Sequence, residues 1–223
     1  MKKSNPKTME AKTLRRDILD ASYNAGACHI GSALSCVDIV LDIHERMDEQ
    51  DVFLFGKASG VATYYCYLAH QGKFSKEKTP EYLKNYPLPS KEVPGIIHSF
   101  GSMGHALPVA VGMALGDRTR DVYVLLSDGE CQEGSTYEAC LFAGQHELTN
   151  LHVYVDDNGL QAGGATSAIL DLTLAFEFMR YILHDCNIVP TVKGKGVDFM
   201  SNDYNWHYRN LTPELYYKAI ERL

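Results

Sequence analysis

Two short polar segments follow apolar stretches that have the composition of buried strands. Residues 122–126 (VYVLL) lead into SDGE, and residues 151–155 (LHVYV) lead into DDNGL. Asp128, Asn158 and a backbone carbonyl of the second loop supply only oxygen atoms, a donor set that suits Mg²⁺. Mg²⁺ completes its octahedron with phosphate and water. Because Gly129 has no Cβ, a diphosphate can approach the backbone there. These residues therefore predict binding of a magnesium diphosphate.

The elements around the two loops predict how the loops meet. A helix is expected over residues 137–147, so residues 122–155 read as a strand–helix–strand unit. The strands of such a unit are parallel, and both loops then leave the same edge of the sheet. Neighbouring strands lie about 4.8 Å apart. We expect Asp128 and Asn158 to project toward one point beyond the carboxyl ends of the strands, where α/β folds bind ligands. Alternatively, each is only a loop or cap residue.

The rest of the chain alternates between strand and helix patterns. Ser35 and Asp38 read as a capping box before a helix, whereas the proline-rich stretch 79–94 is expected to be irregular. No repeat or flexible linker is evident, so residues 1–223 are expected to form one domain. The predicted fold is α/β, with a mostly parallel sheet and helices on both faces. Strands are expected at 51–55 and 188–192, and helices at 9–23, 39–43, 60–70, 109–115 and 171–184, with a last one starting at Thr212-Pro213.

Composition excludes several classes of partner. A net charge of −7 argues against nucleic acid and anionic membranes, which need a basic face. The basic segment 1–17 has no apolar core, so it does not predict a signal peptide. No stretch approaches the roughly 20 apolar residues of a membrane span. The six cysteines form no Cys-x-x-Cys pair. These features predict reduced thiols in a cytoplasmic protein.

The two loop segments resemble a known motif. SDGECQEGSTYEA (127–139) with DDNGLQ (156–161) is similar to the diphosphate-binding motif of thiamine-diphosphate enzymes, in the form that transketolases use. The resemblance implies Mg²⁺ ligands at Asp128, Asn158 and the carbonyl of Leu160. It also implies that Gly129 and Glu130 contact thiamine diphosphate. The family opens this motif with Gly-Asp-Gly, whereas this chain has Ser127.

Other segments resemble the same family. CHIGSALSCVDIV (28–40) places His29 where transketolases have a histidine near the diphosphate and the substrate. TVKGKGVDFMSNDYNWHYR (191–209) places His207 at a second matching histidine, so both are implied as catalytic. HSFGSMGHALPVAVGMALG (98–116) resembles the segment that wraps the cofactor, which implicates Gly101, Met103 and Gly104. Alternatively, each histidine has a structural role.

Two further features have competing interpretations. Glu133 and Glu138 match family glutamates that face the subunit interface, although acidic residues also suit the start of a helix. Residues 193–196 (KGKG) lack the spacing of a phosphate-binding P-loop and are expected to form a turn.

The resemblance implies a partner chain. In transketolases the glutamate that contacts the aminopyrimidine ring lies on a second domain, after the diphosphate-binding one, and this chain stops at Leu223. We expect a pyrimidine-domain subunit, a heterotetramer, and a cofactor at the interface between the two kinds of chain. The isolated chain is expected to be inactive.

Three departures from the family bear on the reaction. Ser59 stands where transketolases have a histidine, the family's Gly-His-Pro segment is absent from residues 79–94, and the chain is short between Asn158 and Lys193. The leading prediction remains transfer of a two-carbon ketol unit between sugar-like substrates. A thiamine-dependent 2-oxoacid decarboxylase or carboligase, and a non-catalytic scaffold subunit, stay open as alternatives.

Overall fold

The structure is a computed structural model that describes residues 9–223. The first eight residues, part of the basic segment that does not predict a signal peptide, lie outside the described residues. Within residues 9–223, no helix has the length and apolar character needed to cross a membrane.

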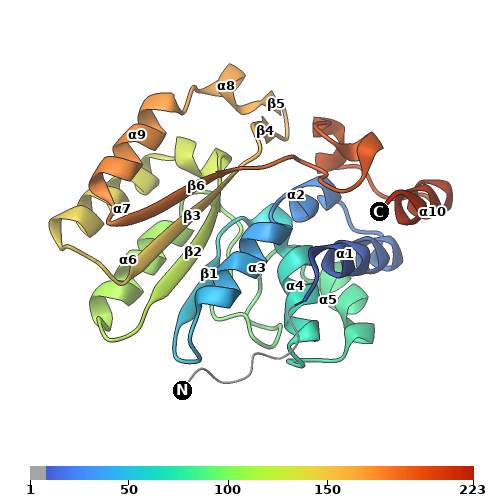
Figure 1. The fold of residues 1–223 in the computed structure, drawn as a ribbon, viewed down its shortest axis with the longest axis horizontal. Helices are drawn as coiled ribbons and strands as arrows, with labels where there is room; N and C mark the ends of the chain where they lie inside the picture. The colour runs from blue at the N-terminus through green and yellow to red at the C-terminus, as the bar shows by residue number, and fades with distance from the viewer. Residues whose placement is uncertain (1–8) are drawn as a thin grey trace.

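A parallel sheet of four strands lies at the centre of the described chain (Figure 1). Its order is β1-β2-β3-β6, and every neighbouring pair is parallel. Ser127 of β2 pairs with Asp156 of β3. The predicted strand–helix–strand unit is therefore confirmed, with helix α7 (Gly134–Gln145) as its crossover. The strands are β1 (Val52–Phe55), β2 (Val122–Ser127), β3 (Leu151–Asp157) and β6 (Asp185–Pro190).

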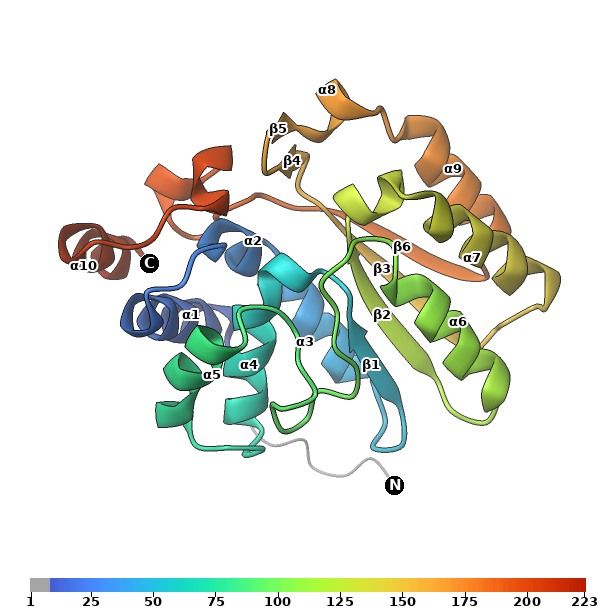
Figure 2. The ribbon, with the colours of Figure 1, turned by 180° about the vertical axis from the view of Figure 1, so that it is seen from behind.

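Helices cover both faces of the sheet, as Figures 1 and 2 show from opposite sides. The pleat of β2 sends Tyr123 and Leu125 into one hydrophobic cluster and Val124 and Leu126 into another. The predicted fold class is confirmed. The first cluster is packed by α1 (Ala11–Ala25), α2 (Ile30–Ser35), α3 (Val37–Arg46), α4 (Val61–His70) and α5 (Thr79–Asn85). The second is packed by α6 (Ala106–Gly116), α7 and α9 (Thr173–Ile182).

The predicted capping box is wrong. Helix α3 begins after Cys36, which makes no side-chain cap. The hydroxyl of Ser35 instead donates to the Ser32 carbonyl and to Asp156, 121 residues further along the chain. Asp38 forms ion pairs with Arg15 and Lys195. Ser35 and Asp38 therefore bind polar groups distant in the sequence and do not form the capping hydrogen bonds that their spacing indicates.

Part of the proline-rich stretch is helical, contrary to prediction. Helix α5 spans Thr79–Asn85 and carries Pro80 in its first turn. Proline is tolerated there because the N–H groups of the first turn have no partner within the helix. Helix α6 also starts earlier than predicted, with Pro108 in its first turn.

The C-terminal region returns to the helices at the start of the chain. After β6, the turn at 193–196 joins α2 through a hydrogen bond from Gly194 N to the Gly31 carbonyl. Two short 3-10 turns follow, Asp198–Met200 and Tyr204–His207, and then α10 (Pro213–Arg222). Thr212 accepts from Leu215 N, which confirms the predicted N-cap of this last helix. The remaining elements are β4 (Leu160–Gln161), β5 (Gly164–Ala165), α8 (Thr166–Ile169) and the 3-10 turns Ala58–Gly60, Lys76–Lys78 and Gly129–Gln132.

Candidate functional site

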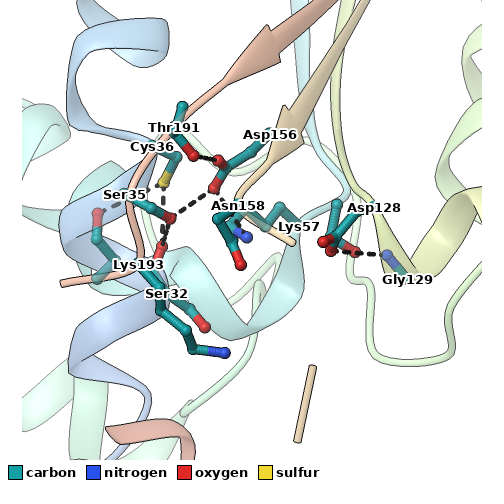
Figure 3. Close-up of polar contacts among 12 residues, drawn as sticks. Ser32, Ser35, Cys36, Lys57, Asp128, Gly129, Asp156, Asn158, Thr191 and Lys193 are labelled. Carbon is teal, nitrogen blue, oxygen red and sulfur yellow. Dashed lines mark hydrogen bonds and ion pairs between the residues drawn. The ribbon is translucent and has the colours of Figure 1, made fainter. Parts of the chain in front are cut away.

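The loop after β2 buries Asp128 without a direct cationic partner. Its side chain is 2% exposed. Oδ1 accepts from Gly129 N at 2.9 Å (Figure 3), and Oδ2 accepts from Thr166 Oγ1 at 2.8 Å. Among the described residues these two donors, both neutral, are its hydrogen-bond partners. A buried carboxylate is costly unless it is paired, so this arrangement suits a cation close to Asp128.

The loop after β3 supplies two further oxygens at the same edge of the sheet. Asn158 is buried, and its Oδ1 accepts from Leu160 N at 3.1 Å. The Leu160 carbonyl accepts from Lys193 Nζ, also at 3.1 Å. An amide oxygen has two lone pairs, so both atoms can still bind a metal ion. Carboxylate, carboxamide and carbonyl oxygens fit Mg²⁺. The described residues contain no metal-binding group of three or more His, Cys, Asp or Glu side chains, so phosphate and water would have to complete the shell.

Lys193 is a site residue that the sequence reasoning missed. Its side chain is 1% exposed, and its Nζ contacts the Leu160 carbonyl and, at 3.3 Å, His207 Nδ1. Burial, followed by repulsion from Lys57, lowers the pKa of Lys193 to about 8. A buried ammonium that touches no carboxylate fits an anionic ligand. The signal was topological, because Lys193 follows β6 at the edge that carries Asp128 and Asn158.

Lys57 follows β1 at this edge and is held by a buried ion pair. Its Nζ lies 2.9 Å from Asp156 Oδ2, and both side chains are almost fully buried. Asp156 also accepts from Ser35, at 2.6 Å, and from Thr191 (Figure 3). Burial has the largest single effect and lowers the pKa of Lys57. The attractions to nearby groups, Asp156 first, together outweigh burial, so the pKa is raised. Lys57 is therefore a fixed positive charge behind the loops.

The structure brings His29 and His207 together. Their rings meet edge to face with centroids 4.7 Å apart, and His29 N donates to the His207 carbonyl. Burial, then the charge of Lys193, lowers the pKa of His207 to about 4 and lowers the pKa of His29 as well. Both rings are neutral at pH 7. Because Lys193 donates to Nδ1 of His207, the proton of that ring is on Nε2.

The loop before α6 reaches the Asp128 loop. A Cβ on Gly129 would lie 3.4 Å from Met103 Sδ. Gly104 is buried with φ +77°, and a Cβ there would lie 2.5 Å from Ser135 Oγ. Gly101 and Met103 are exposed beside it. Met103 of this loop therefore lies beside Gly129, and Gly104 is packed against Glu133 and Ser135. A Cβ on Gly101 would lie 3.4 Å from the Leu88 side chain, so Gly101 packs beside Leu88.

Glu130 points back into its own loop. It is 2% exposed, and its Oε2 accepts from Ser127 N at 2.9 Å. Burial raises the pKa of Glu130 to about 7. Ser127 ends β2, and its hydroxyl accepts from Glu130 N at 3.3 Å. Serine in place of the family's glycine is therefore accommodated. Glu133 is partly buried beside Gly104, and Glu138 is exposed.

A family model and known proteins match this chain. Residues 89–197 match the family model described as transketolase, thiamine diphosphate binding domain. The chain is 33% identical to one of the subunits of the apulose-4-phosphate transketolase of Actinobacillus succinogenes, over 90% of this chain and 89% of that protein. It is 27% identical to the 6-deoxy-6-sulfo-D-fructose transketolase subunit SqwG of a Clostridium species, over 96% and 94%.

A solved transketolase has the same fold. The enzyme of Campylobacter jejuni superposes with a TM-score of 0.84 at 23% identity, over 95% of this chain and 41% of that one. This chain therefore spans about two fifths of the solved transketolase. With the thiamine-diphosphate-binding domain and the Actinobacillus relative both matched, the chain belongs to the transketolase family.

Proposed function

We propose that this chain is the diphosphate-binding half of a split transketolase. Residues 1–223 act as one domain that works in the cytoplasm with a pyrimidine-domain subunit, in a heterotetramer. Together they transfer a two-carbon ketol unit between sugar-like substrates, with thiamine diphosphate and Mg²⁺ as cofactors. The observation that carries the proposal is the convergence of buried Asp128 and Asn158 at the carboxyl ends of the adjacent parallel strands β2 and β3.

Several groups of this chain would hold the cofactor. Asp128, Asn158 and the Leu160 carbonyl would bind Mg²⁺, and the Lys193 ammonium would neutralise diphosphate charge. Gly129, Glu130 and the loop of Gly101, Met103 and Gly104 would form the surrounding wall. When bound, thiamine diphosphate supplies an acidic ring carbon whose conjugate base attacks carbonyl groups.

The two histidines would act on the substrate. His207 is neutral at pH 7 and carries its proton on Nε2, so it donates a hydrogen bond to a sugar hydroxyl or carbonyl oxygen. Lys193 fixes that tautomer. His29 is also neutral and lies edge-on to His207, where it can hand a proton to or from a hydroxyl. Both are therefore catalytic residues in this proposal.

The names of the relatives support a partner chain. Two are called subunits of a transketolase, and each aligns with this chain over about nine tenths of its own length. In the proposal the partner supplies the pyrimidine pocket, and Glu133 and Glu138 face it.

Calorimetry with Mg²⁺ and thiamine diphosphate tests the proposal on the complex of this chain with its partner. Asp128→Ala and Asn158→Ala should each abolish Mg²⁺-dependent binding. Asp171→Ala is the matched control, because Asp171 is exposed and its one hydrogen-bond partner among residues 9–223 is Thr173 before α9. No binding by the wild type, or equal binding by all variants, would favour the scaffold alternative. Turnover by this chain without a partner would contradict the split arrangement.

A further inference from the structure

A cavity of about 710 Å³ lies among α1, α4, α5 and α10, which are side by side in both views (Figures 1 and 2). The 3-10 turn Lys76–Lys78 contributes to its lining as well. No residue proposed above to bind the cofactor or the substrate lines this cavity. Its volume is within the range of small-molecule sites. The cavity is therefore a candidate binding site separate from the proposed active site.

The lining of this cavity is net negative when its histidine, His70, is uncharged. It includes one ammonium, that of Lys76, and three carboxylates, those of Asp17, Asp20 and Glu77. The ammonium of Lys76 forms an ion pair with Asp17 at 2.5 Å. Neither Asp20 nor Glu77 forms an ion pair with any other described residue. The cavity therefore attracts cations and repels anions.

Asp20 is held so that one of its carboxylate oxygens remains available. Its Oδ1 accepts from the Tyr216 hydroxyl at 2.9 Å, and the Tyr216 ring stacks on Tyr23 with centroids 4.3 Å apart. Burial, then the bond to Asp20, raises the pKa of Tyr216, so the hydroxyl keeps its proton and donates it. Oδ2 of Asp20 has no hydrogen-bond partner in the described part of the chain. It is thus a fixed acceptor for a charged N–H donor.

Thr79 indicates a ligand independently of the carboxylates. It lines the cavity and is 1% exposed, and its Oγ1 has no hydrogen-bond partner among residues 9–223. A buried hydroxyl without a partner costs free energy. Its oxygen can accept a hydrogen bond, so an ammonium group that reaches Thr79 removes this cost.

Apolar groups form much of the remaining wall. Ala21 and Cys66 are 5% and 4% exposed, and Ala69 and Pro80 are partly buried. Burial raises the pKa of the Cys66 thiol, so this side chain is uncharged. Methylene groups gain free energy against such a surface, whereas a hydrated metal ion does not. The lining therefore suits an aliphatic chain that carries ammonium groups.

We propose that this cavity binds a linear aliphatic polyamine. Asp20 and Glu77, the two carboxylates without a cation, accept from its ammonium groups, and Thr79 accepts a further hydrogen bond. The methylene chain lies against the apolar wall. The site uses neither thiamine diphosphate nor a residue of the partner chain, so this proposal does not depend on the proposed function.

Isothermal titration calorimetry of the full chain with spermidine tests the site. One-to-one, saturable binding is expected, and 1-aminobutane, which has a single ammonium group, should bind at least about 10-fold more weakly. Asp20→Asn should weaken spermidine binding about 10-fold, because the amide keeps the bond to Tyr216 but loses the charge. Glu81→Gln is the matched control, since Glu81 is an exposed acid in the first turn of α5 and does not line the cavity. Absence of saturable binding, or equal losses in the two variants, would overturn the assignment.

Thr79→Val separates a role in ligand binding from a role in the fold. Valine has the shape of threonine but leaves no buried polar atom unpaired. The variant should be at least as stable as the wild type, whereas its affinity for spermidine should fall about 3- to 10-fold. Urea denaturation measures the stability, and calorimetry measures the affinity. A less stable variant with unchanged affinity would contradict the proposed role of Thr79.

The complex of this chain with its partner distinguishes a small molecule from a protein segment as the occupant. Spermidine should bind the complex and the isolated chain with the same affinity. Loss of binding in the complex would assign the cavity to the subunit interface and overturn the proposal. Unchanged binding by a complex without transferase activity would sustain this site and refute the proposed reaction.

Discussion

Nζ of Lys193 lies 3.3 Å from Nδ1 of His207, and no carboxylate forms an ion pair with either group in the described part of the chain. Both groups are basic and at least partly buried, and burial disfavours the protonated, charged form of each. Burial therefore lowers both pKa values. Repulsion from Lys57 helps to lower the pKa of Lys193 to about 8, and the charge of Lys193 helps to lower the pKa of His207 to about 4. The lysine therefore sets both the charge and the tautomer of the histidine.

Lys193→Met should raise the pKa of His207 from about 4 toward its ordinary value of 6.5. The charge that disfavours the imidazolium is gone, whereas burial still lowers the pKa. Titration of the ring resonances by NMR measures the change. Lys84→Met is the control and should leave the His207 titration unchanged. An unaltered or lower pKa in Lys193→Met would contradict this account of the pair.

Lys57→Met should destabilise the fold by about 3 to 5 kcal/mol, because it leaves Asp156 buried without its cation. Adding Asp156→Asn should recover part of the loss, since the neutral amide keeps partners in Ser35 and Thr191. Chemical denaturation of the two single variants and the double variant gives the coupling energy. Strict additivity of the two changes would show that the ion pair contributes nothing.

Gly194→Ala should cost more stability than Gly72→Ala. Both glycines have a left-handed backbone, with φ of +78° and +73°. A Cβ at Gly194 would lie 2.4 Å from the Met200 carbonyl oxygen, whereas nothing lies within 4 Å of one at Gly72. Gly72→Ala therefore bears only the left-handed penalty, about 1 to 2 kcal/mol. Thermal unfolding of both variants tests this, and equal losses would be the contrary result.

His44 should make stability depend on pH. Its ring packs against Tyr67 and Phe53 with centroids at 4.2 and 5.1 Å, and its Nε2 has no hydrogen-bond partner in the part of the chain that the structure describes. Burial lowers its pKa to about 4. The unfolded chain therefore binds the proton first, and stability is lost as pH falls from about 6.5 to about 4.

Comparison with His44→Phe isolates this contribution. The free energy of unfolding of the wild type, relative to the variant, should fall by about 2 to 3 kcal/mol across that pH range. Urea denaturation at several pH values gives both curves. Parallel curves for the two proteins would show that His44 is not the responsible group.

Rules of topology predicted the part of the site that lies directly at strand ends. Asp128 and Asn158 follow adjacent parallel strands, so their meeting needs only the handedness of the crossover. Lys57 and Lys193 follow the strands on either side and obey the same rule. Neither lysine belongs to the diphosphate motif or to a P-loop pattern, so strand order is the feature that indicates them.

Other contacts had no local signal. Thr166 donates a hydrogen bond to Asp128, 38 residues earlier in the chain, because the hairpin of β4 and β5 returns the chain to the loop after β2. Ser35 bonds to Asp156 across 121 residues, although its spacing from Asp38 indicates a helix cap. In α5, prolines suggest irregular backbone, yet Pro80 occupies the helical position where it is harmless. Sequence patterns report the hydrogen bonds and backbone conformations that neighbouring residues favour. The conformations of these residues depend instead on partners that are distant in the sequence.

The sheet separates two hydrophobic clusters, and residues next to each of the two layers contribute to the candidate site. Lys57 and His207 adjoin the layer of α1 to α5, whereas Met103 and Gly104 adjoin that of α6 and α7. A ligand that contacts residues of both layers would link the two layers at the carboxyl edge of the sheet. Its binding would then favour one fixed arrangement of the two layers.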